Sequence, residues 1–179
     1  MSGSFVRNSL IQNMYKEPIT ILGINPSGKY IGIAVFQGSD LRDWRVKVIN
    51  GKWSKEKMGK ILLVVNYFIR LYDPDVLAIK KLTPCRTSPD LENLISELKN
   101  LSKKKKLRIY QYSIKDLEAF FSAGRKLNNK RQLARTIAAD YPILFHELNK
   151  EFIHKNPYHM RMFEAVALGA ACFSQLDAH

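Results

Sequence analysis

The sequence predicts one α/β domain in which a five-stranded mixed sheet carries helices on both faces. Three strand-like segments come first, joined by short turns, and two more follow, each preceded by a helix-like segment. Strands joined by tight turns pair antiparallel, whereas a helical crossover joins parallel strands, so both kinds of pairing are expected. The length of 179 residues and the 46% hydrophobic content suit a single domain with a full core.

Two adjacent strands joined by a tight turn open the predicted sheet. The segment Ile19–Ile24 is a short apolar run, typical of a strand that is buried on both faces. Pro26 presets φ and Gly28 supplies backbone freedom, which together indicate a turn. The segment Tyr30–Phe36 then returns to β-branched and aromatic residues. Asn25 therefore stands at the end of the first strand, at the lip of the turn, where a side chain can meet a ligand.

The third and fourth strands flank a long amphipathic helix. Apolar and charged residues alternate over Asp43–Ile49, which indicates a half-buried strand. Ser54 is positioned to cap a helix that runs to Tyr72, and the following Asp-Pro pair ends it. The segment Asp75–Ile79 is apolar after its first residue and predicts a fully buried fourth strand.

Helices dominate the second half of the chain. Proline suits the first position of a helix, and a serine followed three residues later by an aspartate can cap another. The predicted elements are a helix from Pro89 through Leu98, a strand Leu107–Tyr112, a helix Ile114–Phe121, a helix Lys130–Ala139, a helix through Leu144, Leu148 and Phe152, and a final helix from Asn156 and Pro157 to Leu176. Residues 1–18 are expected to form a flexible N-terminal arm, and residues 19–179 the domain.

The chain is strongly basic, with a formal net charge of +13 and a pI near 9.8. A charge of this size predicts a polyanionic partner, with nucleic acid ahead of an anionic membrane surface, although basic proteins also occur for solubility alone. Many of the cations fall close together, between Lys103 and Arg135. Within that stretch, the run Lys103–Lys106 is typical of a solvated loop.

Nothing in the sequence predicts secretion or a membrane span. No segment reaches the roughly 18–20 apolar residues that a span needs, and the N-terminal arm lacks the apolar core of a secretory signal. Cys85 and Cys172 share no metal-type spacing, so we expect two reduced thiols in an intracellular, cytoplasmic protein. The arm contains Arg7 and Lys16 and one acid, Glu17, so organellar targeting stays open.

Three stretches, in order, resemble motifs of the RuvC-type Holliday-junction resolvases. The stretch Ile21–Gly28 (ILGINPSG) resembles their opening, a hydrophobic residue followed by Gly-Ile-Asp-Pro-Gly. Pro74–Lys80 (PDVLAIK) is similar to their fourth strand, Pro-Asp-x-x-Ala-Ile-Glu, and Glu164–Gly169 (EAVALG) to the Asp-Ala-Leu-Ala motif of the last helix. The resemblance covers roughly residues 19–176. It implies a ribonuclease H-like fold, nucleic-acid binding and a homodimer.

The residues that depart from these motifs are the ones that hold metal in the family. There, acidic residues on the first strand, the fourth strand and the last helix bind two divalent cations that drive phosphodiester cleavage. Here the first two positions are Asn25 and Lys80, and Arg161 precedes Glu164 by one turn, where resolvases place another acid. A lysine about 4 Å from Mg²⁺ would cost on the order of 8 kcal/mol at an effective dielectric near 20. The resemblance therefore implies a degenerate site with no cofactor, in which only Glu164 is a possible metal ligand.

The main functional expectation is a nucleic-acid-binding protein without two-metal nuclease activity, a pseudoenzyme. DNA is favoured over RNA, and branched DNA is included. Either Lys80 or Arg161 pairs with Glu164 and fills a vestigial cleft, or Lys80 meets a backbone phosphate as a point charge. The residues expected to contact nucleic acid are Lys29, Lys80, Lys81, Arg86, Arg125, Lys126, Lys130, Arg131 and Arg135.

Two other functions stay open. One is an active structure-specific endonuclease that depends on Mg²⁺ or Mn²⁺ and uses a rearranged site, with Glu164 joined by Asp43, Asp73 or Asp75. The other is a protein-interaction subunit that has kept the fold without binding nucleic acid. Cleavage of branched DNA would support the endonuclease. Absence of nucleic-acid binding at low salt would support the protein-interaction subunit.

Overall fold

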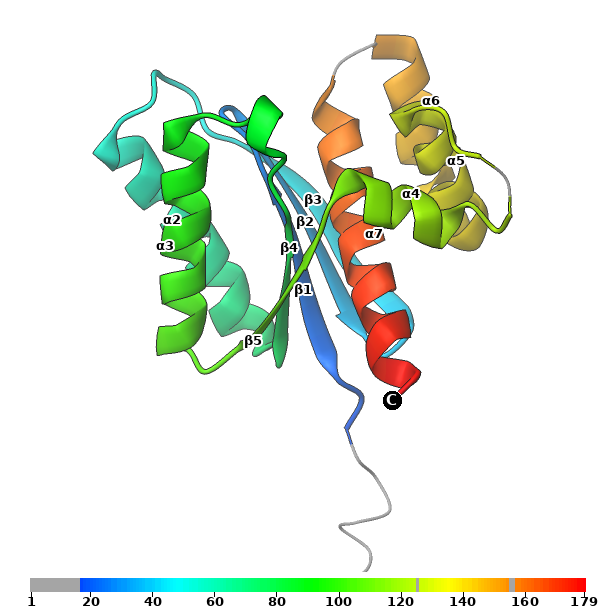
Figure 1. The fold of residues 1–179 in the computed structure, drawn as a ribbon, viewed down its shortest axis with the longest axis horizontal. Coiled ribbons are helices and arrows are strands. Elements are labelled where there is room, and N and C mark those ends of the chain that lie inside the picture. The colour runs from blue at the N-terminus through cyan, green and yellow to red at the C-terminus, as the bar shows by residue number, and fades with distance from the viewer. Residues whose placement is uncertain (1–16, 125, 155–156) are drawn as a thin grey trace, which may run out of the picture.

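A five-stranded sheet lies between two layers of helices (Figure 1). The structure is a computed structural model, and it describes residues 17–124, 126–154 and 157–179. The strand order is β3-β2-β1-β4-β5, with β1, β2 and β3 antiparallel and with β4 parallel to both β1 and β5. The strands are β1 (Thr20–Pro26), β2 (Tyr30–Gln37), β3 (Asp40–Val48), β4 (Val76–Lys80) and β5 (Arg108–Tyr112). The predicted mixed sheet, with its first three strands antiparallel, is confirmed.

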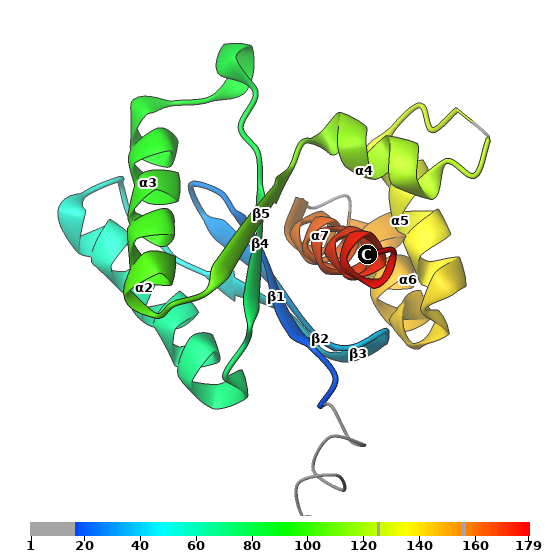
Figure 2. The same cartoon turned by 60° about the horizontal axis from the view of Figure 1, so that its bottom comes forward.

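The helices divide between the two faces of the sheet (Figures 1 and 2). Helices α2 and α3 cover one face, whereas α7 lies on the other and carries α4, α5 and α6 on its outer side. The helices are α2 (Lys55–Tyr72), α3 (Pro89–Lys104), α4 (Ile114–Phe121), α5 (Lys130–Asp140), α6 (Phe145–His154) and α7 (Pro157–Asp177), with 3₁₀ helices at Pro84–Arg86 and Pro142–Leu144. None of the helices within the described residues has the length and apolar character that crossing a bilayer requires.

Local sequence signals account for most of these boundaries. The Ser54 hydroxyl accepts a hydrogen bond from the Lys57 backbone and caps α2, as predicted. Ser113 and Asp116 form a reciprocal capping box at the start of α4. The predicted N-terminal arm lies almost entirely in residues 1–16, outside the described residues. Cys85 and Cys172 are both free thiols.

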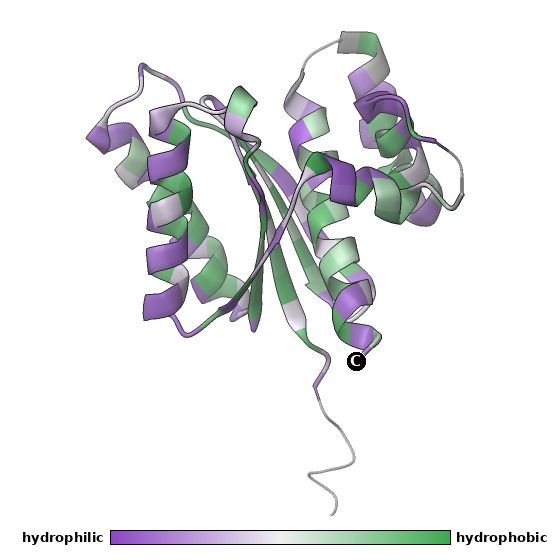
Figure 3. Ribbon diagram, in the orientation of Figure 1, coloured by the Kyte–Doolittle hydropathy of each residue, from purple (hydrophilic) through white to green (hydrophobic). Residues whose placement is uncertain are grey.

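Side chains of β1 alternate between two hydrophobic clusters. Leu22 and Ile24 pack against α2 and α3, whereas Ile21 packs in the cluster around α7. Hydropathy follows the same division, because the apolar faces of the helices turn toward the sheet (Figure 3). The alternation expected for the third strand holds only in part, since Val48 is 44% exposed at the end of an edge strand.

Helix α7 lies in direct backbone contact with the two central antiparallel strands. A Cβ atom added at Gly32 of β2 would meet the Arg161 carbonyl, and one added at Gly23 of β1 would meet the Ala165 carbonyl. Only glycine leaves room for so close an approach. The contact brings Glu164, which lies between those two carbonyls on α7, over the end of β1.

We expect Gly32→Ala to lower the free energy of unfolding by about 1–3 kcal/mol or more, because the added methyl group forces α7 away from the sheet. Gly28→Ala is the matched control, since no atom lies within 4 Å of a Cβ added there. Urea denaturation measures the stability of both variants. A shift of the unfolding midpoint, with an unchanged slope of free energy against urea concentration, gives the change in stability. Equal stability of the two variants would show that α7 does not pack as described.

Candidate functional site

Three elements bring polar side chains together at the carboxyl ends of β1 and β4. The parallel register pairs Ile24 with Ile79, so the next residues of the two strands, Asn25 and Lys80, lie side by side. Helix α7 places Glu164 above them. Asn25 is fully buried within β1, where it pairs with Gly32. The expectation that Asn25 stands at an accessible lip is therefore wrong, because the close packing of α7 covers it.

Glu164 is a fully buried carboxylate with cations around both of its oxygens. Its Oε2 accepts hydrogen bonds from Asn25 Nδ2 at 2.6 Å and from Lys80 Nζ at 2.9 Å. Its Oε1 forms an ion pair with Lys130 Nζ at 2.5 Å. Arg161 Nη1 lies 4.0 Å from Oε2, one turn earlier on α7. One negative charge thus faces three positive charges, and the cluster keeps a surplus of two when all are ionised.

Burial and the neighbouring charges shift the pKa values of both members of the Lys80–Glu164 pair. Burial opposes ionisation of Glu164 and is the largest single influence, but Lys80 and Lys130 together outweigh it and lower the pKa of the carboxyl below its ordinary 4.5. Burial also lowers the pKa of Lys80, an effect that Lys130 and Arg161 reinforce and Glu164 opposes. Glu164 is therefore ionised at neutral pH.

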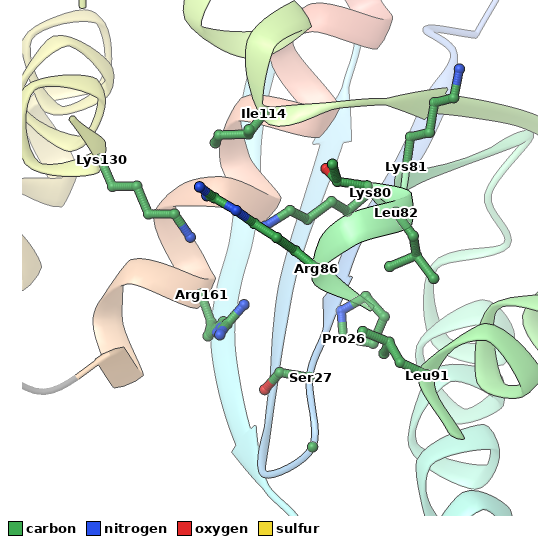
Figure 4. A pocket seen from close by; sticks show the side chains of 12 residues that line it. Pro26, Ser27, Lys80, Lys81, Leu82, Arg86, Leu91, Ile114, Lys130 and Arg161 are labelled. Atoms are coloured by element: carbon green, nitrogen blue, oxygen red, sulfur yellow. The ribbon is translucent and has the colours of Figure 1, made fainter. Parts of the chain in front are cut away.

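A cleft of about 380 Å³ lies over this cluster, beside the turn between β1 and β2. Among the described residues that line it, five are cationic and none is acidic: Lys80, Lys81, Arg86, Lys130 and Arg161. Figure 4 shows Arg86, Lys130 and Arg161 approaching Lys80 from three different elements, whereas Lys81 points away from them. The cleft is suited to an anion.

The residues present do not fit a divalent metal ion. Mg²⁺ requires several oxygen ligands, preferably anionic, and each oxygen of Glu164 already faces an ammonium group. Within the described residues, no three His, Cys, Asp or Glu side chains are grouped so that they could hold a metal. The buried Asn25 Oδ1, which has no hydrogen-bond partner in that part of the chain, is a neutral oxygen.

The rearranged ligand set of the endonuclease alternative is not assembled. Asp43 accepts a hydrogen bond from Tyr72 on the α2 side of the sheet, at 2.7 Å, and pairs with Arg45. Asp75 accepts from the Thr20 backbone at 2.8 Å, at the amino ends of the strands. Asp73 forms the C-cap of α2. None of the three approaches Glu164, because they lie on the other face of the sheet or at its far end.

The other predicted nucleic-acid contacts lie outside the cleft lining. Lys29 is exposed in the turn, with its Nζ 5.4 Å from the centre of the Tyr30 ring. Lys126, Arg131 and Arg135 are exposed on α5 and the loop before it. Arg125 lies outside the described residues. The run Lys103–Lys106 is exposed and precedes β5, at the end of the sheet opposite the cleft.

Sequence reasoning missed the ion pair between Lys130 and Glu164. It expected Lys80 or Arg161 to neutralise the carboxylate and assigned Lys130 to the outer basic surface. The two residues are separated by two further helices, and their meeting depends on how α5 packs against α7. The one local signal is that Lys130 begins α5, directly after its N-cap Asn129.

We expect Glu164→Gln to lower the free energy of unfolding by on the order of 3 kcal/mol at neutral pH, since it leaves the partly buried Lys80 without a counter-charge. The lowered pKa of Glu164 means that its stabilisation is complete above pH 4.5 and is lost as the pH falls through the folded-state value. The difference in free energy of unfolding between Glu164→Gln and the unsubstituted protein should therefore become smaller at acidic pH. Urea denaturation across this pH range tests the prediction. Glu147→Gln is the control, because Glu147 is 22% exposed and its partner Lys150 is 41% exposed. A pH-independent difference would contradict the prediction.

Comparisons with known proteins find no matching protein-family model and no matching curated protein. Solved structures do match. The RuvC protein of T. thermophilus in complex with a Holliday-junction substrate superposes with a TM-score of 0.66 at 15% identity, covering 89% of this chain and 96% of RuvC. The yeast mitochondrial Holliday-junction resolvase Ydc2 gives a TM-score of 0.58 at 17% identity, over 98% of this chain and 89% of Ydc2.

A viral resolvase extends the same likeness. The Fowlpox virus resolvase, solved with substrate Holliday-junction DNA, gives a TM-score of 0.54 at 19% identity and covers 88% of this chain and 99% of its own. Identities this low establish the fold and leave the activity to the residues of the site. The chain has the ribonuclease H-like fold found in RuvC and other Holliday-junction resolvases, as its three motifs predict.

Proposed function

We propose that this chain is a nucleic-acid-binding protein that lacks two-metal nuclease activity. The observation that carries the proposal is the cleft at the carboxyl ends of β1 and β4, lined by five cations and, within the described residues, by no acid. Lysine and arginine are the side chains that meet backbone phosphates most often. The net charge of +13 favours a polyanion over a small anion, because it is much larger than the five cations of the cleft alone could supply.

The preferred partner is DNA in a branched form. Two of the matching folds, RuvC of T. thermophilus and the Fowlpox virus resolvase, are solved with Holliday-junction DNA. The likeness extends over 89% and 88% of this chain. We therefore favour junction DNA over RNA and over plain duplex.

Hydrolysis is not expected, because the groups that would activate water are missing. A two-metal mechanism requires ligands that hold two cations at the scissile phosphate. Here Asn25 is neutral, Lys80 is a cation, and Glu164 is engaged by both Lys80 and Lys130. Cleavage of branched DNA in Mg²⁺ or Mn²⁺ that Glu164→Gln abolishes would establish the endonuclease instead. Failure to bind any nucleic acid at low salt would favour the protein-interaction subunit.

We also propose that two copies associate through α2. Leu63, Tyr67 and Leu71 follow one another at four-residue spacing and are 69%, 59% and 53% exposed. Together they form an apolar stripe on the outer face of the helix, away from the sheet and from the cleft. A symmetric pair of helices would cover both stripes at once.

Binding should weaken steeply as salt increases. We expect log affinity for a labelled four-way DNA junction to fall linearly with log salt, by about 0.9 for each phosphate neutralised. Arg86→Ala should weaken binding and reduce that slope by about one. Lys104→Ala is the control, because Lys104 is exposed at the opposite end of the sheet. Fluorescence anisotropy measures both quantities, and an affinity insensitive to salt would exclude phosphate recognition.

The association through α2 predicts a dimer in solution that Leu63→Glu converts to a monomer, because the substitution places two charges in the apolar contact. Ile143→Glu introduces the same charge at a similarly exposed residue elsewhere and should leave the dimer intact. Sedimentation velocity reports the mass of each form. A monomeric unsubstituted protein, or dimers in both variants, would refute the assignment of this face.

A further inference from the structure

We propose that Lys80 and Lys130 replace metal ions in this cleft, so that a backbone phosphate is held there by fixed ammonium groups and without any divalent cation. The inference rests on the proposed function and specifies how the same site works. It starts from the disagreement between the fold, whose acidic positions hold metal in resolvases, and the side chains that occupy those positions here.

Lys80 and Lys130 hold their ammonium groups beside the buried carboxylate and within the cleft. Lys80 Nζ lies 2.9 Å from Oε2 of Glu164, and Lys130 Nζ lies 2.5 Å from Oε1, so each oxygen of the buried carboxylate has its own cation. Each ammonium carries three N–H donors, and one directed at Glu164 leaves two for another acceptor. Both side chains line the cleft, where they retain 19% and 46% exposure.

Asn25 fits this arrangement better than an aspartate would. Its Nδ2 donates to Glu164 Oε2 at 2.6 Å and to the Arg161 carbonyl at 3.4 Å. A carboxylate at position 25 would face Glu164 at the same distance with no donor between them, and the two charges would repel. An amide at position 25 and a lysine at position 80, together with Lys130 at the other carboxylate oxygen, are therefore mutually consistent. The first two stand where acids would require a metal, and Lys130 supplies a further positive charge.

A ligand that enters the cleft is surrounded by positive charge. Arg161, 26% exposed, and the exposed Arg86 add two further cations to the cleft lining. A phosphodiester entering the cleft brings one negative charge into a surplus of positive charge, whereas a divalent cation would increase the surplus. Electrostatics thus favour the phosphate and oppose the metal.

The test measures junction binding by the full chain with and without divalent cations. Fluorescence anisotropy at matched ionic strength compares excess EDTA with Mg²⁺ and with Ca²⁺. We expect the dissociation constant to agree within about twofold among the three buffers. Lys130→Gln should weaken binding about tenfold or more in EDTA, Lys130→Arg should retain most of the affinity, and Lys104→Ala should match the unsubstituted protein.

A second measurement follows the metal itself. Electron paramagnetic resonance of Mn²⁺ should show no binding to the unsubstituted protein at this site. The double variant Asn25→Asp/Lys80→Glu groups three carboxylates and should bind Mn²⁺ while losing affinity for the junction in EDTA. If this variant does not fold, the comparison of Lys130→Gln with Lys130→Arg still decides the question.

The outcomes separate the two proposals. No junction binding in any buffer at low salt would overturn the proposed function. Binding that requires Mg²⁺ or Ca²⁺, Mn²⁺ occupancy in the unsubstituted protein, or unchanged affinity of Lys130→Gln in EDTA would overturn the replacement of metal by lysine while leaving nucleic-acid binding intact.

Discussion

Neutralisation of the buried Glu164 carboxylate is the interaction on which the site depends. The side chain is fully buried, so its charge is tolerated only with close partners, and Lys80 and Lys130 supply one for each oxygen. These two lysines come from β4 and from the start of α5. The same ion pairs therefore attach the outer layer formed by α4, α5 and α6 to the central sheet at one point. The charges proposed to bind phosphate therefore also hold the tertiary structure together.

That arrangement depends in turn on the distance between α7 and the sheet. Gly23 and Gly32 allow the backbone of α7 to rest on β1 and β2, and Glu164 lies between the two carbonyl groups that make the contact. A larger residue in either strand would raise the helix and lengthen the 2.6 Å hydrogen bond from Asn25. The two glycines thus position the site although neither lines the cleft.

Features set by neighbouring residues were predictable from the sequence, and features set by packing were not. The cap at Ser54, the capping box at Ser113 and the burial of β1 on both faces depend on a few adjacent residues, and each follows from them. The motifs also located Asn25, Lys80 and Glu164 at one end of the sheet. The burial of Asn25 and the partnership of Lys130 with Glu164 arise where α7 and α5 pack, and no local pattern encodes that packing.

A second buried glutamate shows what the compensation at Glu164 achieves. Glu151 on α6 is 6% exposed, and its Oε2, like Oε1 of Glu164, has no hydrogen-bond partner within the described residues. Oε1 of Glu164, however, has the ammonium group of Lys130 at 2.5 Å. Burial raises the pKa of Glu151, and Arg131 and the Met160 backbone only partly oppose it, whereas the two lysines lower the pKa of Glu164. Without Lys80 and Lys130, Glu164 would be in the condition of Glu151. The two lysines instead keep the carboxylate charged, and they give the cleft the positive surplus on which the proposed phosphate binding depends.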